Sequence, residues 1–356
     1  MNLTTLGWNE KNEAAFEEAQ KLGYKAGRVF AEYKNFYKVQ YEEGEVLAEV
    51  SGKLLYEALQ QEDLPAVGDW VAISPRQNEG RGTIHQVLPR SSKFSRKAAG
   101  INTREQIVAA NIDTVFIVNS VNNDFNLRRM ERYLLLAWES GANPVIILSK
   151  ADLCENVEEI IEEAETVAIG VPIHAVSTYI GLGMEALKQY FSQGQTVALL
   201  GSSGVGKSSL INYLLGGTVQ KVQDLRHDGQ KGKHTSTHRE IFVLPEGGLI
   251  IDTPGMREIQ LWDAEEGLQE AFEDVEAIAA QCFFKDCKHD REPGCAVRAA
   301  IQDGTLSVDR LESYKKLERE LRFLEQKQTT ANRLAQRKTK QPVKRGRDKG
   351  SNDEIY

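Results

Sequence analysis

The run Gly201–Ser208, which reads G-S-S-G-V-G-K-S, constrains this chain more than any other feature. It follows the apolar run Thr196–Leu200 and precedes the helix-like stretch Ser209–Leu215. Glycines let such a loop turn tightly enough for backbone N–H groups to converge on phosphate oxygens, and the helix N-terminus adds a favourable dipole. The order of strand, loop and helix predicts a phosphate-binding loop, and an ordinary Gly/Ser turn is the less favoured alternative.

Individual residue types in this loop predict distinct roles. We expect Lys207 to neutralise the β and γ phosphates of a nucleotide and to contribute to catalysis. Ser208 offers its hydroxyl to Mg²⁺, which prefers hard oxygen ligands and keeps several waters. The other nucleotide contacts expected in this loop are Gly201, Ser202, Ser203, Gly204, Val205, Gly206 and Ser209.

A second motif lies downstream, where Leu249–Gly255 reads as a buried strand that ends in D-x-x-G. In a nucleotide site this spacing puts the Asp252 carboxylate beside Mg²⁺, directly or through a water, and the Gly255 N–H near the γ-phosphate. Such a sequence is common by itself. Its position after a phosphate loop, with a Thr/Ser-rich loop between them, makes the prediction much stronger.

A third motif, Ser149-Lys150-Ala151-Asp152, ends another buried-strand run and is similar to the guanine-reading N-K-x-D of GTPases. In that motif the carboxylate, here Asp152, accepts two hydrogen bonds from guanine, and the Lys stem lies along the purine ring. An unpaired buried donor or acceptor costs about 1 to 3 kcal/mol, so Asp152 is a credible selector against adenine. Ser149 is shorter than Asn, and we expect it not to span the same loop contacts. The alternative is a charged turn after a strand.

The order of these motifs along the chain indicates a rearranged domain. A second base-contacting loop is predicted at Ser177 and Thr178, where backbone N–H groups would act. Ordinary GTPases place the base-reading motif after the phosphate loop, whereas here Asp152 precedes Gly201. The sequence therefore predicts a circularly permuted GTPase core, because doubly wound domains often have neighbouring termini. In this order the γ-phosphate-sensing segment runs directly into the next domain.

The segment Gln223–Arg239 is rich in Gly, Lys, His and Thr and is a candidate switch loop. Within it, we favour Thr235 or Thr237 as the hydroxyl that reaches Mg²⁺ and the γ-phosphate. Many GTPases orient the attacking water with a Gln after the D-x-x-G, but this chain has Met256 there. His234 is the nearest polar candidate for that role, since imidazole both donates and accepts. A solvated loop histidine or an RNA contact is the alternative.

Three of the four cysteines and one histidine gather in the pattern C-x4-C-x-H-x5-C. Four soft or borderline ligands this close together suit tetrahedral Zn²⁺, and complete protein coordination indicates a structural ion. Free or disulfide-linked cysteines are the less favoured alternative, because we expect no signal peptide in this chain. The predicted zinc ligands are Cys282, Cys287, His289 and Cys295.

The region before these motifs has short apolar segments broken by Gly and Pro, which predicts a five-stranded barrel of the OB type. The expected strands are Gly27–Ala31, Tyr37–Tyr41, Val46–Val50, Gly68–Ile73 and Gly82–Leu88. Barrels of this type often bind nucleic acid through aromatic residues and basic loops. Candidates for such a face are Phe36, Tyr37 and Lys38, with core packing as the favoured alternative, and a basic exit at Arg90, Lys93, Arg96 and Lys97.

Charge and length indicate a modular protein with a polyanionic partner. No apolar run approaches the roughly 18 residues of a membrane span. The net charge is −8, yet residues 331–350 hold eight Lys or Arg against one Asp, so this tail carries +7 and the remainder about −15. Such a tail is typical of disordered, RNA-binding segments. The preceding run has a helical stripe expected to pack on the zinc module, formed by Leu311, Tyr314, Leu317, Leu321 and Leu324.

The barrel, the permuted S-K-x-D, G-S-S-G-V-G-K-S and D-T-P-G motifs, and the Cys/His cluster together resemble the ribosome small-subunit-dependent GTPases. The resemblance covers nearly all of residues 25–325. It implies a GTPase that docks on the 30S ribosomal subunit and its 16S rRNA late in maturation, is stimulated by the subunit and leaves after hydrolysis. It also implies that His234 helps to position water. Departures from the family pattern are Ser149 and an N-terminal helix within residues 1–22.

This reading predicts a cytoplasmic, monomeric GTP hydrolase that uses Mg²⁺ with GTP and one structural Zn²⁺. The alternatives are a nucleotide-gated RNA-binding scaffold with little hydrolysis and an ATP-dependent RNA enzyme. The expected organisation is a helical extension at 1–24, an OB-fold barrel at 25–98, a circularly permuted α/β GTPase domain at 99–268, a mostly helical zinc-binding domain at 269–328 and a basic disordered tail at 329–356.

Overall fold

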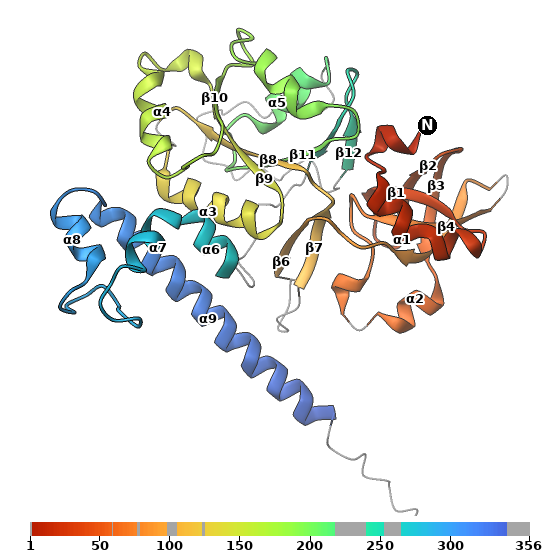
Figure 1. Cartoon of the computed structure of the whole chain (residues 1–356). Helices are drawn as coiled ribbons and strands as arrows, with labels where there is room; N and C mark the ends of the chain where they lie inside the picture. The colour runs from red at the N-terminus through yellow and green to blue at the C-terminus, as the bar shows by residue number, and fades with distance from the viewer. Residues whose placement is uncertain are drawn as a thin grey trace, which may run out of the picture.

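The computed structural model describes residues 2–58, 60–76, 79–97, 105–122, 125–217, 240–252 and 265–339. Within them lie a small barrel, a central sheet with helices on both faces, and a helical C-terminal region (Figure 1). Five residues singled out above lie outside the described ranges, namely His234, Thr235, Thr237, Gly255 and Met256.

The N-terminal barrel closes because β1 pairs with both β2 and β4, giving the cyclic order β1-β2-β3-β5-β4. This confirms the predicted five-stranded barrel. Alternate side chains point inward, as strand geometry requires, and a cluster that includes Val39 and Ile73 fills the interior. The strand bounds are β1 Lys25–Glu32, β2 Tyr37–Tyr41, β3 Gly44–Val50, β4 Trp70–Arg76 and β5 Arg81–Val87.

Short helices surround the barrel. The first turn, η1 (Leu3–Leu6), leads into α1 (Glu10–Lys21), where the Asn9 side chain accepts hydrogen bonds from two backbone N–H groups and caps the helix. Trp8 packs edge-on against Phe16 of α1 and Trp70 of β4. The N-terminal extension is thereby packed onto the barrel. Helix α2 (Gly52–Glu57) and η2 (Gln61–Asp63) lie between β3 and β4.

A two-stranded sheet connects the barrel to the central domain. Strand β6 (Lys93–Lys97) pairs antiparallel with β7 (Glu105–Ala110). The predicted domain boundary at residue 98 therefore falls between two strands that pair with each other. A second connection is the bridge between Ala31 of β1 and Glu240 of β12, which joins the barrel edge to the central sheet.

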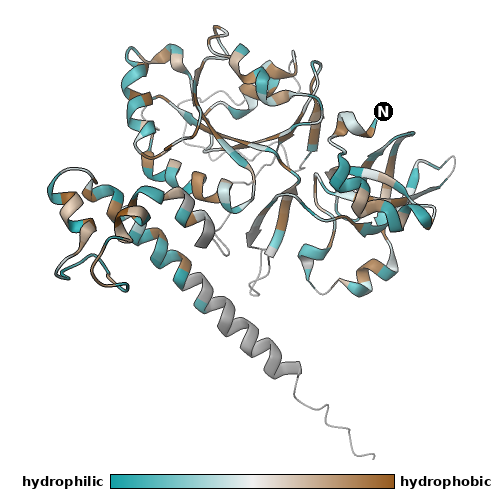
Figure 2. Cartoon of the chain, in the orientation of Figure 1, coloured by the Kyte–Doolittle hydropathy of each residue, from teal (hydrophilic) through white to brown (hydrophobic). Residues whose placement is uncertain are grey.

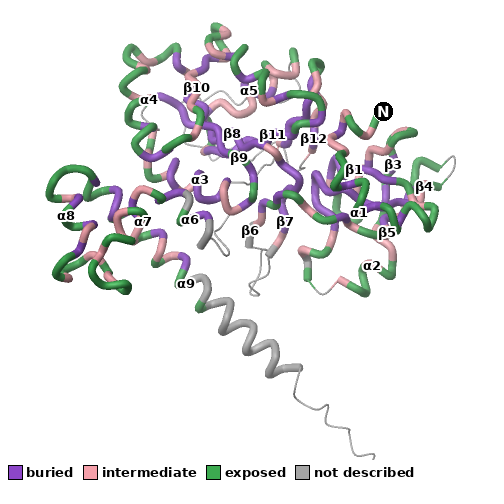
Figure 3. The backbone as a smooth tube through the Cα atoms, viewed as in Figure 1, coloured by how far each residue is buried: buried purple, intermediate pink, exposed green. Residues whose placement is uncertain are grey.

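The central sheet has the strand order β10-β9-β8-β11-β13-β12, with only β12 antiparallel to its neighbour. Helices cover both of its faces, so strands such as β8 are buried at every position (Figure 3). This burial on both faces explains why the central strands are apolar at nearly every position in the sequence. The bounds are β8 Thr114–Ser120, β9 Asn143–Ser149, β10 Ile173–Val176, β11 Thr196–Leu200, β12 Glu240–Val243 and β13 Leu249–Asp252.

The two faces of the sheet have separate cores. Phe116 and Val118 of β8 belong to the cluster that includes α5, whereas Val115 and Ile117 belong to the cluster that includes α3. Helix α3 carries a strongly amphipathic sequence, and its apolar side faces the sheet. The helical segments of this domain are α3 Leu127–Glu139, η3 Ala151–Leu153, α4 Val157–Glu165, η4 Glu185–Phe191 and α5 Lys207–Leu214.

The C-terminal region is helical and packs against α3 (Figures 1 and 2). The predicted stripe on the last helix was expected to face the zinc module. Leu311, Leu317 and Leu321 join one large core to which α3, α6, α7, α8 and the Cys/His segment all contribute, and Lys315 of the same helix contacts His289. The bounds are α6 Glu265–Ala271, α7 Glu273–Ala279, α8 Ala296–Gln302 and α9 Val308–Thr339.

Helix α9 extends away from the body of the molecule (Figure 1). Because it continues to Thr339, the prediction of a disordered tail from residue 329 is wrong for the residues up to that point. Residues 340–356 lie outside the described ranges. Among the helices that the structure describes, none combines the length and apolarity that a membrane span requires.

Candidate functional site

The parallel strands of the central sheet bring the predicted nucleotide motifs to one edge. Strands β9, β10, β11 and β13 end at Ser149, Val176, Leu200 and Asp252, and they all run in the same direction. Ligands of open α/β sheets bind outside the carboxyl ends of the strands. The structure therefore gathers at this edge the base-reading turn, the loop at Ser177 and Thr178, the phosphate loop and Asp252.

The phosphate loop joins β11 to α5 through backbone that favours glycine at three positions, Gly201, Gly204 and Gly206. Gly201 has φ +153°, and a Cβ on it would lie 2.4 Å from the Val118 carbonyl oxygen. Gly206 has φ +98° and caps the N-terminus of α5. The Lys207 Nζ donates hydrogen bonds to the carbonyls of Gly201, at 2.7 Å, and Ser202, at 2.5 Å. The lysine ammonium is thus held against the loop that would cradle the phosphates.

Ser149 reaches the phosphate loop, so the expectation that it could not span such a contact is wrong. Its Oγ lies 2.5 Å from the Val205 carbonyl oxygen and 3.2 Å from that of Asn119. The physical reason is that the phosphate loop lies so close to the end of β9 that even a short hydroxyl reaches the Val205 carbonyl. A hydroxyl has only one proton to share between two carbonyls. Ser149, although shorter than Asn, therefore still ties β9 to the phosphate loop.

Lys150 makes the second link between the base-reading turn and the phosphate loop. Its backbone adopts the left-handed conformation, with φ 60°, and its Nζ donates to the Gly204 carbonyl at 2.7 Å. The turn then continues into η3, where the Asp152 side chain is exposed at the carboxyl edge. The carboxylate predicted to read a base is accessible to a ligand there.

The loop after β10 is shaped by Ser177. This residue is fully buried, and its Oγ accepts hydrogen bonds from the N–H groups of Tyr179, at 3.2 Å, and Ile180, at 3.4 Å. The Ser177 hydroxyl is thus used to hold the loop, and Thr178 is half-buried beside it. Contact of the backbone of this loop with a base stays a prediction, because the N–H groups of Ser177, Tyr179 and Ile180 all donate within the loop.

Two oxygen ligands predicted for Mg²⁺ lie on adjacent elements. Ser208 belongs to the first turn of α5, and Asp252 is the last residue of β13, next to β11 in the sheet. Both side chains are half-buried. A hydroxyl and a carboxylate at a phosphate loop are the hard oxygen donors that Mg²⁺ prefers, so the residues present fit this ion.

The Cys/His cluster forms a compact group between α7 and α8. The ligand atoms of Cys282, Cys287, His289 and Cys295 all lie within 4.8 Å of one another. The Cys282 and Cys295 Sγ atoms are 3.9 Å apart, and the His289 Nδ1 is 3.6 Å and 3.5 Å from them. Zn–S bonds of about 2.3 Å and Zn–N bonds of about 2.0 Å in a tetrahedron give similar separations. The donor set therefore fits a closed metal site.

Backbone groups and one lysine support this cluster. Burial favours the neutral thiol of Cys282, but hydrogen bonds from the N–H groups of Val297 and Ala296 outweigh it and lower its pKa. A thiolate is the form that binds metal. On the other side, the Lys315 Nζ of α9 donates to the His289 carbonyl at 3.2 Å. The cluster is thus packed between α8 and α9.

Three predicted nucleic-acid residues have structural contacts instead. Arg90 was placed at a basic exit, but its side chain is only 15% exposed and makes an ion pair of 2.7 Å with the fully buried Asp69. Burial raises the pKa of Tyr37 to about 12, which agrees with the alternative that this ring belongs to the barrel core. Lys38 pairs with Glu45 at 3.1 Å. Only the tertiary structure reveals these acidic partners.

Sequence reasoning named Phe36 but missed that its ring pairs with a guanidinium at the end of the barrel. The Arg81 guanidinium lies over the Phe36 ring, 4.9 Å from its centroid. This contact joins the loop between β1 and β2 to the start of β5. Its signal in the sequence is weak, because the two residues are far apart and neither belongs to a motif.

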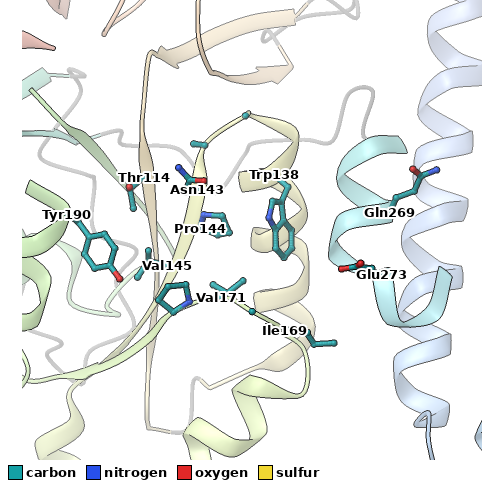
Figure 4. Close-up of a pocket in the computed structure, with 14 residues that line it drawn as sticks. Thr114, Trp138, Asn143, Pro144, Val145, Ile169, Val171, Tyr190, Gln269 and Glu273 are labelled. Atoms are coloured by element: carbon teal, nitrogen blue, oxygen red, sulfur yellow. The ribbon is translucent and has the colours of Figure 1, made fainter. Parts of the chain in front are cut away.

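A cavity of about 1010 Å³ lies at the opposite, amino edge of the sheet. Its lining includes Thr114 and Asn143, which begin β8 and β9, together with Trp138 of α3 and Glu273 of α7 (Figure 4). None of the predicted nucleotide or metal residues lines it. The cavity is therefore a separate hollow between the central domain and the C-terminal helices.

Comparisons with known proteins agree with this architecture. A family model described as RsgA GTPase matches residues 87–262, and one described as 50S ribosome-binding GTPase matches residues 196–333. A relative from Methanosarcina acetivorans, named small ribosomal subunit biogenesis GTPase RsgA, is 47% identical over 90% of this chain and 86% of its own length.

Two solved structures have the same fold. The crystal structure of YjeQ from Thermotoga maritima is 30% identical, with a TM-score of 0.64, and the match covers 84% of this chain and 98% of that one. The structure of YloQ, described as a circularly permuted GTPase, is 23% identical, with a TM-score of 0.60, over 84% of this chain and 95% of that one. The second likeness shows the fold, and the permuted order of the motifs agrees with it.

Proposed function

The chain belongs to the RsgA family of small ribosomal subunit biogenesis GTPases, and from this membership we propose that it hydrolyses GTP to GDP and phosphate on the 30S ribosomal subunit. It would assist the late maturation of the subunit and be stimulated by it. We place this activity in the cytoplasm, where ribosomal subunits mature, and assign it to a monomer. The observation that carries the proposal is the meeting of the base-reading turn and the phosphate loop, joined by Ser149 and Lys150.

The roles of the site residues follow from this arrangement. Asp152 would select guanine, and the backbone of the loop at Ser177 and Thr178 would close over the base. The phosphate-loop amides and Lys207 would stabilise the charge on the transferred phosphoryl group. Ser208 and Asp252 would hold Mg²⁺, which neutralises phosphate charge when bound. The loop residues Gly201, Ser202, Ser203, Gly204, Val205, Gly206 and Ser209 would complete the nucleotide contacts.

The water-orienting group is proposed from the sequence. Met256 has no useful hydrogen-bonding capacity, so we assign the positioning of water to His234, with Thr235 or Thr237 on Mg²⁺ and the γ-phosphate and with the Gly255 N–H near that phosphate. Without a Gln in this place, intrinsic turnover would be slow. Binding of the subunit would order the segment and raise the rate.

The barrel offers support for an interface with 16S rRNA. OB-type barrels bind oligonucleotides with the loops that follow their first and fourth strands. Here those loops meet where Arg81 lies over Phe36, and Lys34 is exposed beside them. The neighbouring face of β3 carries exposed Glu45 and Glu49 and would repel phosphate. We therefore assign rRNA contact to this end of the barrel rather than to its β2–β3 face.

The Cys/His cluster is proposed to hold one structural Zn²⁺. Three thiolates and one imidazole leave no open position for a substrate. Metal analysis of the purified protein, together with a Cys287→Ser variant, would identify the ion. We expect zinc in a ratio near one to one and its loss in the variant, whereas iron or no metal would contradict the assignment.

The experiment that tests the function is phosphate release from GTP and from ATP, with and without purified 30S subunits, over a salt series. We expect stimulation that is selective for GTP and fades with salt, because contacts with RNA release counterions. Equal and unstimulated rates would overturn the proposal. Stimulation of ATP hydrolysis would indicate the ATP-dependent alternative.

His234→Ala separates an enzyme from a nucleotide-gated scaffold. We expect loss of subunit-stimulated turnover with GTP binding retained, since the histidine is assigned to the water and not to the nucleotide. His227→Ala is a matched control, because it removes an imidazole from the same segment. If both variants keep full turnover, His234 does not position the water.

A further inference from the structure

The loop that follows β10 exposes an aromatic side chain beside the base-reading turn. We define the base loop as residues 177–183, between β10 and η4. Within it Tyr179 is 89% exposed. An aromatic side chain that becomes covered buries roughly 150 to 250 Å² of surface. The Tyr179 ring therefore offers a large contact area to a ligand at this edge of the sheet.

The base loop lies between the base-reading turn and the helix that follows the phosphate loop. Strand β10 pairs parallel with β9 up to Val176 and Ser149, so the base loop and the base-reading turn leave the sheet side by side. On its other side the base loop touches α5, because a Cβ on Gly181 would lie 3.3 Å from the Tyr213 Oη. A nucleotide with its phosphates at the phosphate loop and its base at Asp152 would therefore lie beside the base loop.

Hydrogen bonds inside the base loop fix the backbone of Tyr179. The Ser177 Oγ accepts from the N–H groups of Tyr179, at 3.2 Å, and Ile180, at 3.4 Å. The Ser177 N–H donates to the Leu182 carbonyl at 2.9 Å. These three N–H groups are already used, so the Tyr179 side chain is the larger contact that the base loop offers. A ring on a fixed backbone loses less conformational entropy when it binds than a ring on a mobile one.

A purine base has two kinds of surface, and the Asp152 carboxylate matches only one of them. The polar edge of guanine carries the N–H groups that a carboxylate accepts, whereas both faces of the ring are flat. The Lys150 stem is expected along one face, and its Nζ is held by the Gly204 carbonyl at 2.7 Å. The opposite face needs a flat cover. Aromatic side chains provide one, because every base has a π-face on which they stack.

We propose that Tyr179 stacks on the purine ring of the bound nucleotide and supplies affinity, while Asp152 supplies selectivity for guanine. This inference rests on the proposed function, because it adds a contact to the same nucleotide site. Ile180 and Leu182 are also exposed, so an apolar protein surface is the competing occupant. The chemistry favours the base, because an apolar surface laid over this edge would bury the exposed Asp152 carboxylate without a partner.

The test is the affinity of the full-length protein for GDP and for inosine diphosphate, measured by isothermal titration calorimetry. Tyr179→Ala and Tyr179→Leu should weaken the binding of both nucleotides by about five- to a hundred-fold, the range for loss of one base–aromatic stack. The ratio of the two affinities should not change, because the bases differ at the polar edge and not in their faces. Tyr179→Phe and Tyr179→Trp should keep the affinity, and GDP should change the fluorescence of the new indole. A Leu variant that binds as tightly as the wild type would overturn the stack.

Matched controls separate a stack from a general effect on the base loop. Ile180→Ala removes a side chain that is 60% exposed from the next position and should leave GDP affinity unchanged, because an aliphatic group does not stack on a base. Tyr56→Ala removes a ring that is 90% exposed on α2 of the barrel and should also have no effect. All these side chains are exposed, so the variants should unfold at the same urea concentration as the wild type. Equal losses in Ile180→Ala and Tyr179→Ala would overturn the assignment to the ring.

The two proposals fail in distinguishable ways. Wild-type protein that binds GDP through Tyr179 but is not stimulated by 30S subunits would refute the proposed function alone. Stimulation of the wild type, with GDP affinity unchanged in Tyr179→Ala, would refute the stack alone. If Tyr179→Ala kept its GDP affinity but lost the stimulation, the ring would belong to an interface with the subunit rather than to the nucleotide site.

Discussion

Arg28 and Arg310 are both almost fully buried, and each attaches one end of the chain to the central domain, but they use different acceptors. The Arg28 guanidinium donates to main-chain carbonyls from three separate segments. These are the carbonyls of Leu6, of Gly68 at 3.2 Å and of Asn111 at 2.9 Å. The N-terminal joint is therefore built from neutral dipoles, with the side chain also lying 5.5 Å from the centroid of the Trp70 ring.

The C-terminal joint is built from charges. Arg310 of α9 donates to the Glu131 Oε1 of α3 at 2.8 Å and to both carboxylate oxygens of Asp274, at 3.0 and 3.1 Å. It also donates to the Ala271 carbonyl at 2.6 Å and lies over the Phe272 ring, 4.1 Å from its centroid. The Glu131 side chain is completely buried, so this cluster holds α3, α7 and α9 together.

The difference shows two ways to bury a guanidinium. Burial lowers the pKa of Arg28 to about 10, and the carboxylates of Asp113 and Asp69 only partly oppose this effect. The group stays charged at neutral pH, yet its removal would leave no buried counter-charge in hydrogen-bond contact. Removal of Arg310 would leave the buried Glu131 with only Arg128, whose side chain is 43% exposed, and the Ser313 hydroxyl as partners. We therefore expect the two joints to respond very differently to loss of the arginine.

The largest expected decrease in the free energy of unfolding is that caused by Arg310→Met. Loss of one partner of a buried ion pair costs about 3 to 5 kcal/mol when the remaining charge has no other partner. We expect the lower end of this range, because Arg128 and Ser313 still contact Glu131. Urea unfolding followed by tryptophan fluorescence and circular dichroism would measure it. The double variant with Glu131→Leu should regain much of the lost stability. A loss below about 1 kcal/mol in the single variant would contradict the role assigned to charge.

For Arg28→Met we expect a smaller decrease in the free energy of unfolding, about 1 to 3 kcal/mol. The substitution removes donors from buried carbonyls but leaves no buried charge without its partner. The same unfolding experiment applies. Arg28→Lys should recover little of the loss, since one ammonium cannot reproduce the planar fork that reaches three carbonyls. A cost equal to that of Arg310→Met would erase the distinction between the two joints.

The smallest effect is expected at the exposed edge of the C-terminal joint. Arg132 of α3 and Glu320 of α9 form a bidentate pair at 2.7 and 2.9 Å, but their side chains are 34% and 33% exposed. A double-mutant cycle of Arg132→Ala and Glu320→Ala should give a coupling energy below about 1 kcal/mol that decreases with salt. A larger, salt-independent coupling energy would mean that the exposure of the two side chains does not predict the strength of this ion pair.

The sequence was most informative where function depends on residues that are close together in the chain. The phosphate loop, the base-reading turn and the Cys/His cluster are each contiguous, and the structure places each as a unit on the expected kind of element. The five barrel strands were also found, because alternation within a strand is a local signal. His234 lies outside the described residues, and its role stays a prediction.

The errors arose where a partner was distant in the chain. Arg90 was assigned to a basic surface because its acidic partner Asp69 and the fold of the intervening segment could not be seen in the sequence. Ser149 was judged too short because the approach of the phosphate loop to β9 was unknown.

By itself the sequence determined the chemistry of this protein: which side chains offer phosphate, base and metal ligands, and in what permuted order. These depend on residue type and short spacing, which local geometry fixes. Only the tertiary structure decided which charges are compensated, as with Arg310 and Glu131. The physical reason is that burial and pairing depend on contacts between segments far apart in the chain, and no local pattern records them.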